Sequence, residues 1–330
     1  MVTASAPGKV YLFGEHAVVY GEPAIPCAVE RRATVTVEER TDGRLRVDAQ
    51  DLEIEGFTVE YGTVDGDPGV EVPTELLEAA TEYVDGAVEQ ARDAAGAPGA
   101  GFDVAVESDI PLGAGLGSSA AVVVATIAAA AAELGVTLDP REVADRAYRV
   151  ELEVQNGQAS RADTFCSAMG GAVRVEGDDC RTLDAPDLPF VIGYDGGSGN
   201  TGELVARVRS LREEYGFAAD TVAAIGDVVR AGESVLGGDG DEASLAELGR
   251  LMDFDHGLLE ALGVSSRSLD EMVWAAREAG AHGAKLTGAG GAGCIVALDE
   301  TPETETALSY SKSCEQAFRA ELAREGVVVS

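Results

Sequence analysis

A glycine-rich segment, Pro111–Ala121, has the composition of a loop that binds phosphate groups. Three of its residues permit positive φ and close approach of the backbone to a ligand, namely Gly113, Gly115 and Gly117. Ser118 and Ser119 follow where a helix should start, so free N–H groups and the positive end of the helix dipole would face a bound anion. A serine hydroxyl there could also reach a phosphate-bound Mg²⁺. No Gly-Lys-Ser/Thr follows, which excludes a Walker A loop and leaves a plain glycine turn with serine caps as the alternative.

A second segment, Ala6–Gly21, holds Lys9 and His16, two residue types that are rare in this chain. Only three lysines occur in the whole sequence, Lys9, Lys285 and Lys312, and the other basic residues are arginines. A lysine kept where arginine is otherwise used indicates a need for a compact ammonium group. The alternative is a strand with a surface lysine.

The third segment, Lys285–Cys294, is also rich in glycine. Its residues Gly288, Gly290 and Gly293 formally satisfy the G-x-G-x-x-G pattern of a dinucleotide-binding loop. Such a loop opens a helix, whereas this one runs into the strand-like segment Cys294–Leu298. We therefore reject a dinucleotide site and interpret the segment as a second glycine loop that closes over a substrate.

These three segments, in this order and at these distances, resemble the three signature motifs of the GHMP kinases (galactokinase, homoserine kinase, mevalonate kinase and phosphomevalonate kinase). Gly14–Gly21, Asn200–Val205 and Leu258–Ser265 resemble the mevalonate kinase branch. The resemblance covers nearly the whole chain. It implies an α+β fold with an N-terminal ribosomal-protein-S5-like domain, 1–185, and a C-terminal ferredoxin-like α/β domain, 186–330. Aspartates and prolines between Asp178 and Pro189 mark the same boundary in the sequence.

The resemblance also assigns roles by position. Asp163, ahead of Gly170-Gly171, matches an aspartate that faces the substrate hydroxyl, so it would act as general base, and Lys9 would stabilise the incipient alkoxide beside it. A helix-capping or Asx-turn aspartate is the alternative for Asp163. The residues expected to bind ATP and its phosphates are Pro111, Gly113, Ala114, Gly115, Leu116, Gly117, Ser118 and Ser119.

Two residues are expected to hold Mg²⁺. Ser119 matches the family's metal-binding serine, with Ser118 as the less favoured choice. The metal-binding glutamate lies in the segment 150–155, where alignment from the helix gives Glu151. One extra residue near Asn156 leaves Glu153 as a rival, and two glutamates at i and i+2 cannot face the same side of a helix.

The substrate half of the site is placed by resemblance alone. Its expected residues are Glu15, His16, Thr201, Gly288, Ala289 and Gly290. His16 could bond a substrate carboxylate or hydroxyl, or be a packed structural histidine. Arg161 could pair with a carboxylate through both nitrogens, or be a surface arginine. Ala292 departs from the family, which commonly has glycine there, without being expected to abolish activity.

The elements that must position these residues follow from periodicity and turn residues. We predict two short strands around a Pro7-Gly8 turn and a half-buried strand at Glu30–Arg40. The expected helices are Thr74–Ala95, a buried helix from Ser118, and Asp139–Val154. The remaining expected strands are Phe102–Glu107, Gly170–Val175 and Cys294–Leu298.

Composition restricts the possible partners. The chain has 59 acidic and 24 basic residues, a net charge of −35, and such a surface repels nucleic acid and anionic membranes. We interpret the acidity and the scarcity of lysine as adaptation to molar salt, where the Debye length is about 3 Å; an acidic mesophilic protein is the alternative. Five scattered cysteines without a C-x-x-C pair, and no signal peptide, predict a cytoplasmic protein. A homodimer is possible.

The expected reaction moves the γ-phosphoryl group of ATP to the primary hydroxyl of mevalonate, with Mg²⁺ as cofactor. One alternative is another GHMP kinase, acting on phosphomevalonate, a sugar or homoserine. A phosphorylated substrate would demand more cationic side chains than this chain offers. The other alternative is a ligand-sensing relative that lost catalysis.

Overall fold

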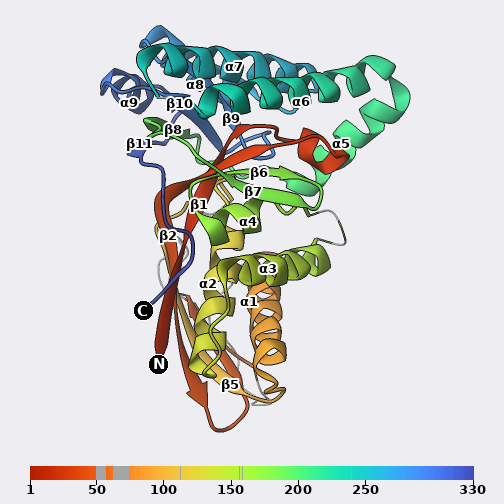
Figure 1. Ribbon diagram of the computed structural model, residues 1–330, viewed down its shortest axis with the longest axis vertical. Helices are drawn as coiled ribbons and strands as arrows, with labels where there is room; N and C mark the ends of the chain where they lie inside the picture. The colour runs from red at the N-terminus through yellow and green to blue at the C-terminus, as the bar shows by residue number, and fades with distance from the viewer. Residues whose placement is uncertain (50–56, 62–73, 112, 156, 158, 239) are drawn as a thin grey trace.

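The computed structural model describes residues 1–49, 57–61, 74–111, 113–155, 157, 159–238 and 240–330. Of two β-sheets, the larger runs along most of an elongated molecule and the smaller lies at one end, and helices pack on each sheet (Figure 1). Helices and sheets are mixed without regular β-α alternation, so the predicted α+β class is confirmed. None of the described helices is long and apolar enough to cross a membrane.

The larger sheet contains the strand that carries Lys9. Its main path runs β12-β1-β2-β5-β3-β4, and β6 joins it at β2 with β7 beyond. All pairs are antiparallel except β3 with β5. The strands are β1 (Val2–Phe13), β2 (Ile25–Arg40), β3 (Leu45–Ala49), β4 (Phe57–Tyr61), β5 (Gly101–Ser108), β6 (Ala172–Glu176), β7 (Asp179–Leu183) and β12 (Val328–Val329).

The predicted turn at Pro7-Gly8 is wrong, because β1 runs straight through it. The ladder between β1 and β2 shifts register between these two residues instead of ending there. Proline has no N–H to give to a ladder, so a bulge is the accommodating structure. A Cβ atom on Gly8 would lie 2.8 Å from the carbonyl oxygen of Leu116, and the Lys9 N–H donates to that oxygen at 2.8 Å. The bulge therefore brings β1 against the predicted phosphate loop.

Four helices pack on the larger sheet. α2 lies directly on β1 and β2, and α1 and α3 pack against α2. Because α2 is alanine-rich and buried on nearly all sides, other elements can approach its axis closely. The helices are α1 (Thr74–Ala95), α2 (Ser118–Glu133), α3 (Pro140–Val154) and α4 (Ala162–Met169). The first three match the predicted positions, whereas α4 has no counterpart among the predicted helices.

The smaller sheet has the order β11-β8-β10-β9 and is antiparallel throughout. Helices α6, α7 and α8 lie over it in Figure 1, and α7 and α8 pack on β9. Its elements are β8 (Phe190–Tyr194), β9 (Gly283–Thr287), β10 (Cys294–Leu298), β11 (Gln316–Ala320), α5 (Thr201–Glu214), α6 (Gly216–Leu236), α7 (Glu242–Ala261), α8 (Arg267–Glu278) and α9 (Glu303–Ser309). A short 3₁₀ helix, η1 (Ala17–Tyr20), follows β1.

After β11 the chain returns to the larger sheet. Ala323 N–H donates to the Ala28 carbonyl at 2.9 Å, and β12 pairs with β1 beside the N-terminus (Figure 1). The final residues therefore pair with the N-terminal half of the chain. The predicted domain boundary at residue 185 stays a prediction. The C-terminal residues would cross that boundary, because they pair with strands of the predicted N-terminal domain.

Candidate active site

Lys9 and Asp163 meet between β1 and the first turn of α4. The Lys9 Nζ atom lies 3.2 Å from Asp163 Oδ2, and it also donates to the Gly115 carbonyl at 2.9 Å. The lysine side chain is only 3% exposed, whereas that of Asp163 is 29% exposed. The ammonium group thus links a solvent-accessible carboxylate to the glycine loop. A ligand can reach the carboxylate without displacing the lysine.

The glycine loop ends as predicted, at the N-terminus of a helix. Gly117 caps α2 with φ 74°, and a Cβ atom there would lie 3.0 Å from Cγ of Lys9. The first N–H groups of a helix have no partner within it, so this end can accept an anion. Ser119 is exposed at this end, while Ser118 is buried and its Oγ has no hydrogen-bond partner among the described residues.

The third glycine segment closes the same region. A Cβ atom on Gly115 would lie 3.1 Å from the Thr287 carbonyl oxygen, so the two glycine loops are in contact. The Thr287 hydroxyl accepts the Tyr11 N–H at 2.8 Å and so ties the third segment to β1. The loop 288–293 connects β9 to β10 as an antiparallel hairpin, so it runs into a strand, as predicted, and does not open a helix.

The two candidate metal-binding glutamates lie in different surroundings. Glu151 on α3 is buried, and burial together with the Asp163 charge raises its pKa to about 8, against the opposing charge of Lys9. Glu153 is exposed on the same helix. A buried carboxylate beside another carboxylate suits a bound cation, which would offset the cost of burying the charge. The geometry therefore favours Glu151, and the Oγ of Ser118, buried and unpartnered, is a second oxygen that fits a cation.

The predicted substrate residue Glu15 belongs to a buried charge cluster. Its carboxylate accepts a hydrogen bond from Lys285 Nζ, and Asp255 on α7 lies 3.5 Å from the same nitrogen. All three side chains are at most 1% exposed. Burial raises the pKa of Glu15 to about 8, with Lys285 opposing and Asp255 adding to the shift. In these contacts Glu15 faces Lys285 rather than an open cavity.

His16 adopts an unusual backbone conformation next to this cluster. Among the described residues it is the one non-glycine residue with a positive φ, 60°. Its Nε2 lies 2.8 Å from the carbonyl oxygen of Ala289 in the third glycine segment. Burial lowers the pKa of its ring, so the ring is neutral near pH 7. Its Nδ1 is buried without a partner among the described residues. Strain held at a polar, buried side chain is typical of a ligand site.

The other predicted substrate residues lie nearby. Thr201 is the exposed first residue of α5, and Asn200 caps that helix by accepting the Glu203 N–H at 3.1 Å. A Cβ atom on Gly199 would lie 2.2 Å from the Gly290 carbonyl oxygen, so the start of α5 packs on the third glycine loop. The structure thus places Thr201 beside the loop that also contacts His16.

Comparison with known proteins identifies this arrangement. The family model described as GHMP kinases N terminal domain matches residues 82–171, GHMP kinases C terminal matches 241–313, and a galactokinase galactose-binding signature matches 2–39. The mevalonate kinase of Thermococcus gammatolerans is 42% identical over 330 residues, covering 99% of this chain and 97% of that protein. That of Pyrococcus furiosus is 42% identical over 332 residues, covering 99% and 98%. The chain belongs to the mevalonate kinase family of the GHMP kinases.

Solved structures agree with this family. The crystal structure of Methanococcus jannaschii mevalonate kinase matches with a TM-score of 0.78 at 27% identity, covering 97% of this chain and 98% of that one. A mevalonate kinase of L. major in complex with R-mevalonate has the same fold, with a TM-score of 0.77 at 23% identity, covering 96% and 94%. The predicted family, fold and kinase class are therefore confirmed, whereas the roles of single residues are proposals.

Sequence reasoning did not single out three residues at or beside this site: Tyr11, which contacts Asp163, and Asp255 and Lys285 of the buried cluster. Lys285 could have been predicted from the scarcity of lysine. As for Lys9, a lysine kept where arginine is otherwise used indicates a need for a compact ammonium group. Arg161 is a half-buried residue that pairs with Asp145 at 2.6 Å and Asp178 at 3.0 Å, so its guanidinium is already engaged by carboxylates of the protein. No sequence signal was available for Asp255, which reaches the site from a helix remote in sequence.

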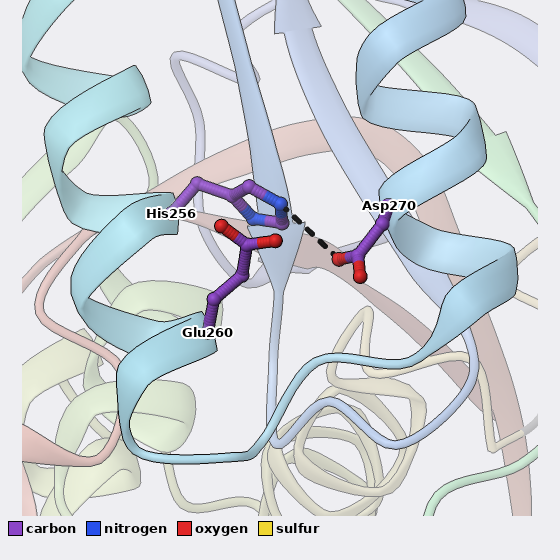
Figure 2. A group of neighbouring side chains, drawn as sticks. All are labelled: His256, Glu260 and Asp270. Carbon is purple, nitrogen blue, oxygen red and sulfur yellow. Dashed lines mark ion pairs between the residues drawn. The ribbon is translucent and has the colours of Figure 1, made fainter.

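A separate group, His256, Glu260 and Asp270, brings three possible metal ligands together between α7 and α8 (Figure 2). His256 Nε2 lies 3.4 Å from Asp270 Oδ1, and Nδ1 accepts the Leu286 N–H at 3.3 Å. Burial, aided by Arg277 and Lys285, lowers the pKa of His256 to about 3, so the ring is neutral. A neutral ring that accepts at Nδ1 carries its proton on Nε2. Neither nitrogen then offers a free lone pair, and we assign no metal here.

Proposed function

We propose that this kinase transfers the γ-phosphoryl group of ATP to the primary hydroxyl of mevalonate. One observation carries the proposal: the accessible Asp163 carboxylate is held by Lys9, which in turn contacts the glycine loop at the N-terminus of α2. A base for a hydroxyl and a cradle for a phosphate chain therefore lie side by side. The close family relatives named mevalonate kinase support the choice of acceptor.

Each residue then has a definite task. The N-terminus of α2 and the loop 111–119 hold the phosphate chain of ATP. Asp163 accepts the proton of the acceptor hydroxyl, and the Lys9 ammonium stabilises the alkoxide that develops. Phosphoryl transfer has a loose transition state with little covalent chemistry for the protein, so positioning and charge neutralisation supply most of the rate.

We propose that Glu151 holds Mg²⁺ together with a serine at the start of α2, either Ser119, which matches the family's metal-binding serine, or Ser118, whose buried Oγ has no partner among the described residues. The bound ion would neutralise charge on the phosphate oxygens of ATP. Glu151 is a buried carboxylate near Asp163 that feels the charge of Lys9 but forms no salt bridge within the described part of the chain, and Ser118 and Ser119 start the helix at the predicted phosphate loop. Glu151→Gln should raise the Mg²⁺ concentration needed for half-maximal activity, while Glu153→Gln, its matched control, should not. If Glu153→Gln raises the required Mg²⁺ concentration and Glu151→Gln does not, Glu153 is the metal-binding residue.

In the substrate half we propose that His16, Thr201 and the segment 288–290 contact mevalonate. The neutral His16 ring has an unpartnered nitrogen, and Thr201 is exposed beside the same loop. The nearby cations Lys9 and Lys285 are both engaged in pairs. Because these two described cations are already paired, the site favours an unphosphorylated acceptor over phosphomevalonate.

The experiment is ADP release by the purified protein with Mg-ATP in molar KCl. Mevalonate, phosphomevalonate, galactose and homoserine are offered separately. We expect turnover on mevalonate alone. Turnover on another acceptor would overturn the substrate but keep the mechanism. A folded protein without turnover on any acceptor would favour the ligand-sensing alternative. Repeating the assay at low salt tests the proposed adaptation to molar salt, which predicts loss of activity as KCl is removed.

A further inference from the structure

Tyr11 contacts the proposed base from the same strand as Lys9. Residues two apart on a β-strand project to the same face, so both side chains of β1 reach Asp163. The Tyr11 hydroxyl donates to Asp163 Oδ1 at 2.8 Å, while Lys9 Nζ lies 3.2 Å from Oδ2. Each carboxylate oxygen therefore has its own donor. Together the two donors fix the rotation of the carboxylate about its χ2 bond.

Tyr11 is itself held firmly. Its backbone N–H donates to the Thr287 hydroxyl at 2.8 Å, and its side chain is buried within the core of the larger sheet. The Lys9 ammonium lies 4.5 Å from the centre of its ring, a favourable cation–π distance. The ring thus supports the lysine while the hydroxyl supports the aspartate.

The Tyr11 hydroxyl keeps its proton under working conditions. Burial and the neighbouring Asp163 charge raise the pKa of this phenol well above its ordinary value, and a hydrogen bond from Ser160 opposes them only in part. A phenol that stays protonated is a permanent donor. A carboxylate has room for about four hydrogen bonds, so two donors leave lone pairs for the acceptor hydroxyl.

We infer that Tyr11 is a positioning residue for phosphoryl transfer, whose hydroxyl holds the Asp163 carboxylate in the orientation that accepts the substrate proton. The inference rests on the proposed role of Asp163 as base. The hydroxyl donates its hydrogen bond to Asp163, and the buried ring and the backbone of Tyr11 supply the packing. Removing the oxygen alone therefore separates the two contributions.

The test is Tyr11→Phe, which deletes one oxygen and leaves the ring over Lys9. We expect kcat to fall about tenfold, the worth of a hydrogen bond to a charged group, with KM for ATP and for mevalonate changed by less than about twofold. Tyr20→Phe is the matched control, because Tyr20 donates to the Val205 carbonyl at 3.1 Å, away from Asp163. It should leave kcat unchanged. A kcat of Tyr11→Phe within about twofold of wild type would overturn the inference.

A double-mutant cycle with Asp163→Ala distinguishes positioning from general destabilisation. If Tyr11 acts through Asp163, Tyr11→Phe should cause no further loss in the Asp163→Ala background. An equal tenfold loss in both backgrounds would show an effect independent of Asp163 and contradict the inference. The single variant Asp163→Ala tests the role of Asp163 as base independently of Tyr11. If Asp163 is not the base, this variant should keep most of the activity. That result would remove the premise of the inference as well.

Discussion

Two of the three lysines of this chain are buried, and they serve contrasting sites. Lys9 pairs with Asp163, a carboxylate that is 29% exposed, next to a helix N-terminus. Lys285 pairs with Glu15 and Asp255, and no member of that cluster is more than 1% exposed. The third, Lys312, is exposed. The chain has thus kept lysine mainly where an ammonium group is enclosed by protein.

The difference between the two sites is one of access. A half-open carboxylate can meet a substrate, so the Lys9–Asp163 pair can do chemistry. A fully enclosed cluster can only hold its neighbours: Lys285 Nζ also donates to the Leu286 carbonyl at 2.8 Å, and Asp255 accepts the Gly14 N–H at 3.4 Å. These contacts join the end of β1 to β9 and α7. The first pair should therefore govern rate and the second cluster stability.

Lys9→Met sharpens this contrast most strongly. Losing the cation beside a developing alkoxide should lower kcat by about 10²–10³-fold. Stability should change by less than about 1 kcal/mol, because Asp163 is partly solvated and keeps the Tyr11 hydrogen bond. Steady-state kinetics and urea unfolding check the two parts. A variant that keeps its rate but unfolds would reverse the assignment.

Lys285→Met should show the opposite pattern. It leaves Asp255 buried without its cation and Glu15 without its hydrogen-bond donor, and breaking a buried pair in this way typically costs about 3–5 kcal/mol. The expected result is a lower urea midpoint, measured in molar KCl. Lys312→Met is the matched control on an exposed lysine and should cost less than about 0.5 kcal/mol. Equal midpoints for the two variants would break the comparison.

Glu15→Gln has a smaller effect that depends on pH. The folded-state pKa of Glu15, about 8, lies above its ordinary value, so the native protein holds a proton that the unfolded chain releases. This contribution to stability is complete below the unfolded pKa and is lost as pH rises through about 8. Lys285, Asp255 and Tyr11 are the groups that interact with Glu15. The variant should match wild type near pH 5 and become relatively more stable by pH 9, as measured by thermal unfolding. A difference that stays constant with pH would show that Glu15 does not titrate in this range.

The sequence predicted helices and strands accurately where one local feature, such as periodicity or a glycine boundary, determines them. The bounds of Thr74–Ala95 and Cys294–Leu298 agree with the structure, because helical periodicity and a glycine boundary define them. The Pro7-Gly8 turn was wrong because a close contact with Leu116, remote in sequence, turns it into a bulge. The pairing of Lys9 with Asp163 was available only from the family resemblance. The contacts of Tyr11 and Asp255 form only where segments distant in sequence meet in the fold. The spacing of residues along the chain does not predict such contacts.

The most direct test of the central claim is single-turnover phosphoryl transfer to mevalonate by wild type and Asp163→Asn, each preloaded with Mg-ATP. If Asp163 is the base held by Lys9, the variant should bind ATP as wild type does and transfer the phosphoryl group about 10²–10⁴-fold more slowly. A loss smaller than about tenfold, in a folded variant with unchanged ATP affinity, would contradict the account and remove Asp163 from that role.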